Sequence, residues 1–493
     1  MNARSDYFQR VRPLIGQGLS RSAVAFRGLS ITGRVLDLLA ACMLRTVVVR
    51  EPDEAAGWPL SGECAARGGE SALEVLRRWF AWKNEHEPLE WRADGPADLE
   101  IVGEWGFGAP AVIVDAAART VRMRLPPGDR FAHLDLSCHV AREVRDVLLG
   151  RKLLQDSSTF FGGGGWPFAQ APREVAGSRR APLPVAGKHV MVVGCGSVGS
   201  GVARTLRDLA ARWTLVDGSP VSAFNPSRQW FGLGEVGMLK VEALAERLAP
   251  APVCAISQSL GVKDTGLLER QLADDRPDVV VLATGTRDDA AIAPTLWSAG
   301  VPHVVAYAYP QARFFEVTTV LPEEHTPCAH CFRGHLYRGV ESQAPIPDEV
   351  ASFLYSRPEA SDRDRLYVDL VAEPATKIET SRIADVVSRC AVEAMLEPGR
   401  RSAWMARMLA EGTTCLLGAN AVERREDGRL AYGMTHAGQV VRLGLSDVAG
   451  AEERITCESC GRRMDVVHRT ELPEGDEAAV DLGLLGALEP GLP

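Results

Sequence analysis

A strand, a glycine-rich turn, a helix and a second strand follow one another near the middle of this chain. An apolar strand is expected over residues 188–193, and it leads directly into the turn Gly194–Gly199. A helical pattern covers residues 202–209, and a second apolar run over residues 213–216 ends at Asp217. This order is typical of a βαβ unit that binds the phosphates of a nucleotide, and it predicts a largely parallel sheet.

The glycines and the acidic residue have separate expected tasks. Gly194, Gly196 and Gly199 are expected to let the backbone turn tightly and to let phosphate approach the unpaired N–H groups of the helix N-terminus. Asp217 lies 23 residues after Gly194, where its carboxylate can accept ribose hydroxyls.

Polar and cationic residues come directly after the second strand. The run Asn225-Pro-Ser-Arg228-Gln229 is followed by Lys240, eleven residues after Gln229. A dehydrogenase has no need of two cations here, whereas an enzyme that uses a triphosphate must neutralise the charge of departing pyrophosphate. The pattern therefore favours triphosphate chemistry.

These segments together resemble a known family. GCGSVG, LVDGS, NPSRQ and VGMLK are similar to the adenylation domain of the ThiF/MoeB/ubiquitin-activating enzyme family, over roughly residues 185–465. The resemblance implies a Rossmann-like α/β adenylation domain that uses ATP and Mg²⁺. It also implies that Asn225, Arg228 and Lys240 contact the triphosphate and that Gln229 supports their loop.

The magnesium ligand is less plain. The family carries an aspartate beside a threonine at the end of the strand that corresponds to residues 279–284. Here the acids follow a few residues later, so Asp288 is the candidate ligand, with Asp289 behind it. The alternative is that both acids simply begin the next helix, where negative charge is favourable.

Two Cys-x-x-Cys pairs predict a metal site. Cys328 and Cys331 form one pair, Cys457 and Cys460 the other, and 125 residues separate the pairs. Four thiolates on two tight turns are the ligand set of a closed, structural zinc ion, which would tie distant segments together. Two independent pairs, one of them redox-active, remain the alternative.

A thioester-forming cysteine is a further candidate. Ubiquitin-activating relatives pass the acyl group to a thiol, and Cys415 could lie in a loop near the second cysteine pair. Burial as an inert thiol is the alternative for Cys415. Cys390 lies in an apolar helical pattern and Cys195 in the glycine turn, so both are expected to be packing residues.

Length and composition indicate two or three soluble globular domains. The chain has 493 residues, 46% of them apolar and 24% charged, and a net charge of −9 that argues against nucleic acid. We predict a smaller α+β N-terminal domain (1–160), a Gly/Pro-rich linker (161–184), the adenylation domain (185–468) with an insertion (335–372), and an acidic tail (469–493). With no apolar run of bilayer length and no secretory signal, the chain is expected to be cytoplasmic.

The leading functional hypothesis is ATP-dependent adenylation of the C-terminal carboxylate of a ubiquitin-like protein, with thioester transfer to an enzyme cysteine and then a conjugating partner as an optional further step. A second hypothesis is adenylation of a peptide or sulfur-carrier protein without the thioester. An NAD-dependent oxidoreductase and a scaffold with a decayed nucleotide site are the others. The resemblance implies a homodimer, or a pseudo-dimer in which residues 1–160 are a degenerate adenylation-like half. Those residues could instead grip a partner.

Overall fold

The structure is a computed structural model. It describes residues 19–50, 71–83, 89–105, 110–125, 130–160, 185, 187–207, 209–258, 265–285, 288–308, 312–329, 331, 375–410, 412, 414–420, 439–443, 454–457, 460, 463–465 and 479–481. The segments expected to be a linker (161–184) and an insertion (335–372) lie outside these residues.

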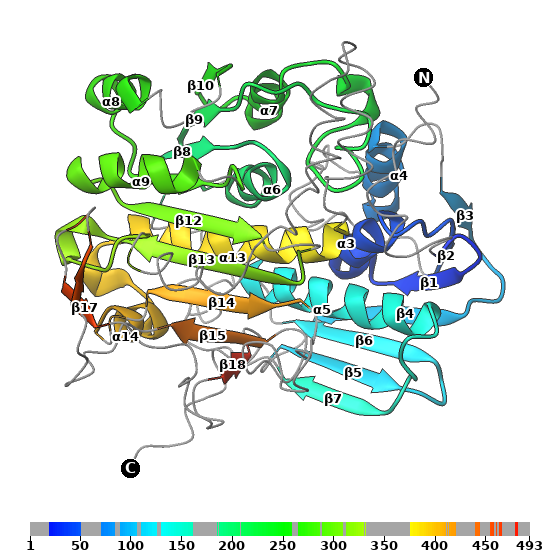
Figure 1. The fold of residues 1–493 in the computed structure, drawn as a ribbon. Helices are drawn as coiled ribbons and strands as arrows, with labels where there is room; N and C mark the ends of the chain where they lie inside the picture. Colours follow the sequence, from blue (N-terminus) through cyan, green and yellow to red (C-terminus); the bar gives the residue numbers. More distant parts are fainter. Residues whose placement is uncertain are drawn as a thin grey trace, which may run out of the picture.

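The N-terminal half contains a seven-stranded sheet of order β3-β2-β1-β4-β6-β5-β7 (Figure 1). Its strands are β1 (Ala23–Arg27), β2 (Thr46–Val49), β3 (Glu90–Arg92), β4 (Leu99–Trp105), β5 (Ala111–Asp115), β6 (Thr120–Leu125) and β7 (Ser157–Phe160). The helices are α3 (Leu29–Ala40), α4 (Ala72–Lys83) and α5 (Arg130–Leu148). Strands β3, β2, β1, β4 and β6 are parallel to one another. Strand β5 pairs with β6 and with β7 in antiparallel fashion.

The second half contains a nine-stranded sheet of order β10-β9-β8-β11-β12-β13-β14-β15-β18. Its parallel strands are β8 (His189–Val193), β9 (Arg212–Val216), β10 (Val253–Ile256), β11 (Val279–Leu282) and β12 (His303–Ala308). The antiparallel strands are β13 (Phe314–Val320), β14 (Cys415–Ala419), β15 (Gln439–Leu443) and β18 (Ala479–Asp481), and β16 (Arg454–Thr456) pairs separately with β17 (Arg463–Asp465). The helices are α6 (Ser197–Leu206), α7 (Lys240–Leu248), α8 (Thr265–Asp274), α9 (Asp288–Ser298), α13 (Lys377–Met395) and α14 (Ala403–Ala410).

The parallel strands of the second sheet are buried on both faces, which explains their continuous apolar sequences. Val190 and Val192 belong to the large core that includes residues of α6 and α13. Met191 and Val193 face a separate core with Leu268 of α8 and residues of α9. Successive side chains of β8 thus serve opposite faces, as a doubly wound sheet requires.

The two halves repeat one strand order. Each has five parallel strands. Numbered by their order in the chain, these strands lie side by side in the order third, second, first, fourth, fifth in both sheets. The N-terminal half is therefore a more regular α/β unit than the α+β domain expected from the sequence. Residues 479–481, expected to belong to an acidic tail, pair with β15 instead.

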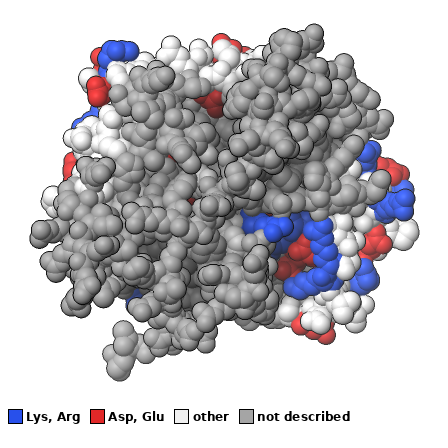
Figure 2. Space-filling view, viewed as in Figure 1, with Lys and Arg blue, Asp and Glu red and all other residues white. Residues whose placement is uncertain are grey.

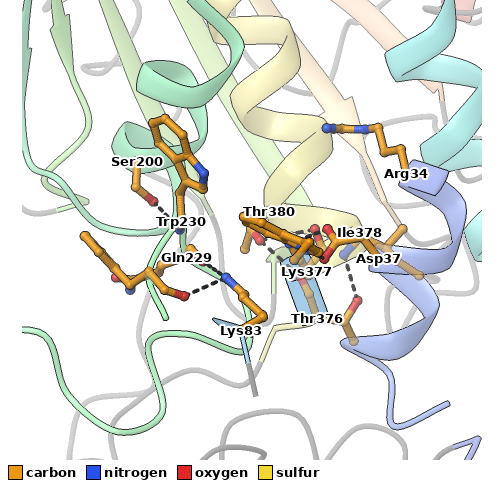
Figure 3. A network of polar contacts seen from close by, with 12 residues as sticks. Arg34, Asp37, Lys83, Ser200, Gln229, Trp230, Thr376, Lys377, Ile378 and Thr380 are labelled. Carbon is orange, nitrogen blue, oxygen red and sulfur yellow. Dashed lines mark hydrogen bonds and ion pairs between the residues drawn. The ribbon is translucent and has the colours of Figure 1, made fainter. Parts of the chain in front are cut away.

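Helix α13 lies between the halves and joins them (Figure 1). Asp385 at its middle pairs with Arg34 of α3 at 2.8 Å, with both side chains almost fully buried. Lys377 at its N-terminus pairs with Asp37 of α3, whose carboxylate also accepts a hydrogen bond from Trp79 Nε1 of α4 (Figure 3). These two buried charges of α13 are thus matched by opposite charges from the N-terminal half.

Most long elements match their sequence patterns. The helix predicted to cover residues 378–396 is α13, and the strands predicted over 111–115 and 120–125 are β5 and β6. Among the described helices, none combines the length and the apolar character that crossing a bilayer requires.

Candidate functional site

The predicted glycine turn connects β8 to α6. Gly194 has φ +89°, a conformation that favours glycine, and a Cβ there would lie 2.6 Å from the Ala283 carbonyl oxygen. A Cβ on Gly199 would lie 1.9 Å from the Gly194 oxygen, so the third residue of α6 must be glycine for the turn to pack against the helix. Gly196 is different: among the described residues, an added Cβ would meet nothing within 4 Å. The described part of the chain therefore leaves space at the N-terminus of α6, where a phosphate can approach N–H groups.

Asp217 is bound to this turn by its own hydrogen bonds. One carboxylate oxygen accepts from the Cys195 N–H at 2.8 Å, and the other accepts from the Ser219 N–H at 2.8 Å and from the Ser219 hydroxyl. The carboxylate retains acceptor capacity, since each oxygen carries two lone pairs. Asp217 therefore lies beside the glycine turn, as expected from the sequence, and its role as a ribose acceptor stays a prediction.

Lys240 is connected to the same group. It is the first residue of α7, and its ammonium donates to the Ser219 hydroxyl oxygen at 2.7 Å. The order of contacts is glycine turn, Asp217, Ser219 and Lys240. Ser219 was missed by the sequence reasoning, because a serine after a strand has no distinguishing pattern.

The loop from Asn225 to Gln229 is buried and internally hydrogen-bonded. The Asn225 side chain accepts from the Ser222 N–H at 2.8 Å, and its backbone carbonyl accepts from the N–H groups of Arg228 and Gln229. Asn225 therefore shapes the turn itself. Arg228 is 8% exposed. A buried guanidinium on this loop gives it a positive charge.

A residue of the N-terminal half completes this loop. Lys83, the last residue of α4, is 3% exposed and donates to the carbonyl oxygens of Gln229 at 2.5 Å and Phe231 at 2.8 Å (Figure 3). The sequence reasoning missed Lys83, because the only local signal is the aromatic-rich segment around it, WFAWK.

The two acids after β11 begin α9. The Asp289 carboxylate is buried and accepts from the N–H groups of Thr284 and Gly285 at 3.3 and 3.2 Å, so it stabilises the loop after the strand. Asp288 is the first residue of α9, and its side chain lies outside the described residues. Its magnesium role stays a prediction.

The four predicted thiols lie together. Their sulfur atoms are all within 4.8 Å of one another, with Cys328 3.8 Å from Cys331 and 3.6 Å from Cys457, and Cys331 3.5 Å from Cys460. Sulfurs around a tetrahedral zinc ion are about 3.8 Å apart, given a Zn–S distance of about 2.3 Å. The donor set and its spacing therefore fit a structural metal ion that ties the β13–β14 side of the sheet to the β16–β17 hairpin.

The three other cysteines of interest are buried in the protein. Cys415 is the first residue of β14, paired with Thr318 of β13, so the expected loop position is wrong. Burial raises the pKa of Cys415 well above its usual value, and nearby Glu316 raises it further. This opposes thiolate formation. Cys195 and Cys390 are fully buried, as expected of packing residues, and burial raises the pKa of Cys390 to about 12.

No family model matches the chain, and no curated protein matches it. Among solved structures, the chain is similar to E. coli MccB, with 16% identity, 58% of this chain and 68% of that chain covered, and a TM-score of 0.34. The structure of E. coli MccB with ATP gives 13% identity, 56% and 68% coverage, and a TM-score of 0.33. Selenomethionine PaaA gives 16% identity, 50% and 73% coverage, and a TM-score of 0.34. At these identities and TM-scores, the likenesses carry no conclusion about what this chain does.

Proposed function

We propose that this chain adenylates the C-terminal carboxylate of a peptide or small protein, such as a ubiquitin-like or sulfur-carrier protein, at the expense of ATP. The observation that carries the proposal is the chain of contacts from the glycine turn through Asp217 and Ser219 to Lys240. It joins the glycine turn at a helix N-terminus, a carboxylate that could accept ribose hydroxyls and a cation in one group.

The reaction needs placement and charge more than a protein nucleophile. A carboxylate oxygen of the substrate attacks the α-phosphorus of ATP, the bond to the β-phosphate oxygen breaks, and pyrophosphate leaves with its electron pair. The product is a mixed anhydride, the acyl-adenylate. Negative charge grows on the departing pyrophosphate, and Lys240 and Arg228 are the cations that would stabilise it. Mg²⁺, with Asp288 as its candidate ligand, would neutralise further phosphate charge.

The proposal ends at the acyl-adenylate and includes no thioester on Cys415. That thiol is fully buried in the sheet, and its raised pKa leaves almost no thiolate at neutral pH. Release of the adenylate to an external acceptor, such as an amine or a thiol of a partner protein, does not require Cys415.

In this proposal, the N-terminal half of the same chain takes the place of the partner lobe that the resembled family uses. Lys83 of α4 reaches the loop that carries Arg228. A pseudo-dimer made of two halves of one chain, in place of a homodimer, accounts for that contact.

We also propose that the four cysteines bind one Zn²⁺ with a structural role. All four positions of a tetrahedral ion would be filled by Cys328, Cys331, Cys457 and Cys460, which leaves none for water or substrate.

The decisive experiment is ATP–pyrophosphate exchange with a panel of peptides and small proteins that end in a free carboxylate. We expect exchange with at least one substrate, and a loss of at least ~100-fold in Lys240→Ala and Arg228→Ala, since each removes a charge-stabilising contact. Lys152→Ala is the matched control, because Lys152 forms an exposed ion pair with Glu143. An unchanged rate in both site variants would contradict the proposal, and tight binding of NAD without ATP binding would favour an oxidoreductase.

A further inference from the structure

The loop that carries Arg228 is held by a helix from the other half of the chain. The Lys83 ammonium donates to the backbone carbonyls on either side of Trp230, those of Gln229 and Phe231. A buried ammonium is costly unless its donors are used, so these two carbonyls account for part of what keeps it there. The rings of Trp79 and Trp82 lie 5.4 and 5.6 Å from the ammonium, in the range of cation–π attraction.

Packing next to this contact is equally close. A Cβ added to Gly232 would lie 2.4 Å from the Trp82 ring, so the indole rests directly on the backbone of this segment. The Arg247 guanidinium of α7 lies 3.6 Å from the Trp82 ring centroid. Trp82 therefore contacts both the Gly232 backbone and a side chain of α7.

The same segment is also tied to the glycine-turn helix. The Trp230 N–H donates to the Ser200 hydroxyl oxygen at 3.2 Å, and Ser200 is a fully buried residue of α6 (Figure 3). Lys83 and Ser200 thus hold Trp230 and its two neighbours from opposite halves of the molecule.

We infer that Lys83 is a positioning residue of the nucleotide site: it fixes the backbone directly after Arg228 and so fixes where that guanidinium meets the phosphates. Its ammonium binds protein carbonyls and is not required to touch the nucleotide. The inference rests on the proposed function, because it assumes that Arg228 binds phosphate. It makes the N-terminal half part of the nucleotide site.

The experiment measures ATP affinity of the full-length chain by calorimetry. We expect Lys83→Met, which keeps the length of the side chain and removes its donors, to weaken ATP binding at least ~10-fold. Lys83→Arg, which keeps charge and donors, should recover most of the loss. Lys152→Met is the matched control, since Lys152 lies in an exposed ion pair, and it should bind ATP as the wild type does.

Double-mutant cycles separate positioning from general destabilisation. If Lys83 acts through Arg228, Lys83→Met should add little to the loss already caused by Arg228→Ala. The same change should add its full effect to Lys240→Ala, because the Lys240 ammonium donates to Ser219, which lies outside this loop. Full additivity with Arg228→Ala would overturn the inference.

The remaining outcomes are also decisive. If the wild type binds ATP and Lys83→Met binds it with the same affinity, the inference is overturned and the proposed function stays intact. A wild type that binds no ATP would overturn both. If Lys83→Met does not fold, Lys83→Gln, which removes the charge and keeps an NH2 donor group, takes its place in the same two cycles.

Discussion

The ion pair between Arg34 and Asp385 provides the sharpest test of how the two halves are held together. Its nitrogen and oxygen are 2.8 Å apart, and the side chains are 0% and 1% exposed. The Asp385 carboxylate also accepts from the Thr205 hydroxyl at 3.4 Å and the Cys138 thiol at 3.7 Å. Asp385→Ala would therefore leave a buried guanidinium without this carboxylate and two further donors without this acceptor.

The cost follows from the electrostatics. Two unit charges about 4 Å apart attract by about 4 kcal/mol at an effective dielectric constant of about 20. Removal of one partner from a buried pair costs about 3–5 kcal/mol, because the other charge stays desolvated. We expect Asp385→Ala to lower the free energy of unfolding by that amount, measured by urea denaturation followed by circular dichroism.

A double replacement distinguishes a desolvation cost from a general loss of packing. Arg34→Met with Asp385→Leu removes both charges and fills similar volume, so it should recover to within about 1–2 kcal/mol of the wild type. Glu104→Ala is the control, since its pair with Arg122 at 3.0 Å has side chains 45% and 51% exposed and should cost about 0–1 kcal/mol. If Asp385→Ala costs no more than this control, or if the double variant is as unstable as the single one, the reasoning is refuted.

Four further outcomes are expected. Purified protein should carry about one Zn²⁺ per chain by elemental analysis, and Cys457→Ser should lower both zinc content and melting temperature; normal stability without metal would contradict the structural site. Gly196→Ala should fold normally and lose ATP affinity, whereas Gly199→Ala, with a Cβ 1.9 Å from a carbonyl oxygen, should lose stability as well; equal stability of the two would contradict the clash. Cys415→Ala should keep adenylate formation, measured by pyrophosphate exchange, and abolished exchange would restore the thiol to the mechanism. Burial lowers the pKa of His303 to about 4 from an ordinary 6.5, so the folded state favours the neutral imidazole. The resulting contribution to the free energy of unfolding is fully present above pH 6.5, and about 3 kcal/mol of it is lost as the pH falls toward 4. His303→Gln should remove that part of the acid sensitivity in urea titrations at pH 4 to 7, and an unchanged acid sensitivity would contradict the pKa shift.

The sequence was sufficient where chemistry is local. The glycine turn, Asp217 at the end of β9 and the start of α7 at Lys240 are separated by short, regular elements, so spacing alone brings them near one another. The two cysteine pairs are 125 residues apart, yet their ligand chemistry predicted the cluster that the structure contains.

The contacts between halves could not be read from the sequence. Lys83 is 146 residues from Gln229, and nothing in either segment indicates the other. Helix α13 shows the same limit: its apolar pattern predicted a helix, but its charges at Lys377 and Asp385 would be assigned to a solvated face. They are buried because α3 supplies Asp37 and Arg34. For Cys415, an apolar strand and a glycine-bounded loop both fit the short sequence. The segment forms a strand because it pairs with β13, which lies far away in the sequence.

The repeated strand order allows the turn after the first strand to be compared between the two halves. In both halves a glycine with positive φ follows the first strand, and Gly28 has φ +68°. A Cβ added to Gly28 would clash with the backbone of Gly103 in β4, just as a Cβ added to Gly194 would clash with the backbone of Ala283 after β11. The close approach of strand, turn and helix thus belongs to the fold and needs glycine with or without a ligand. The helices that follow differ at their N-termini. The first residues of α3 are all buried, and the His133 ring of α5 lies 2.7 Å from the Ile31 carbonyl oxygen, whereas among the described residues nothing occupies the space beside Gly196, before α6. The start of the helix is thus packed among protein atoms in the first half and less enclosed by the described residues in the second. The first half still contacts the loop of the second, because Lys83 of α4 donates to the carbonyls of Gln229 and Phe231.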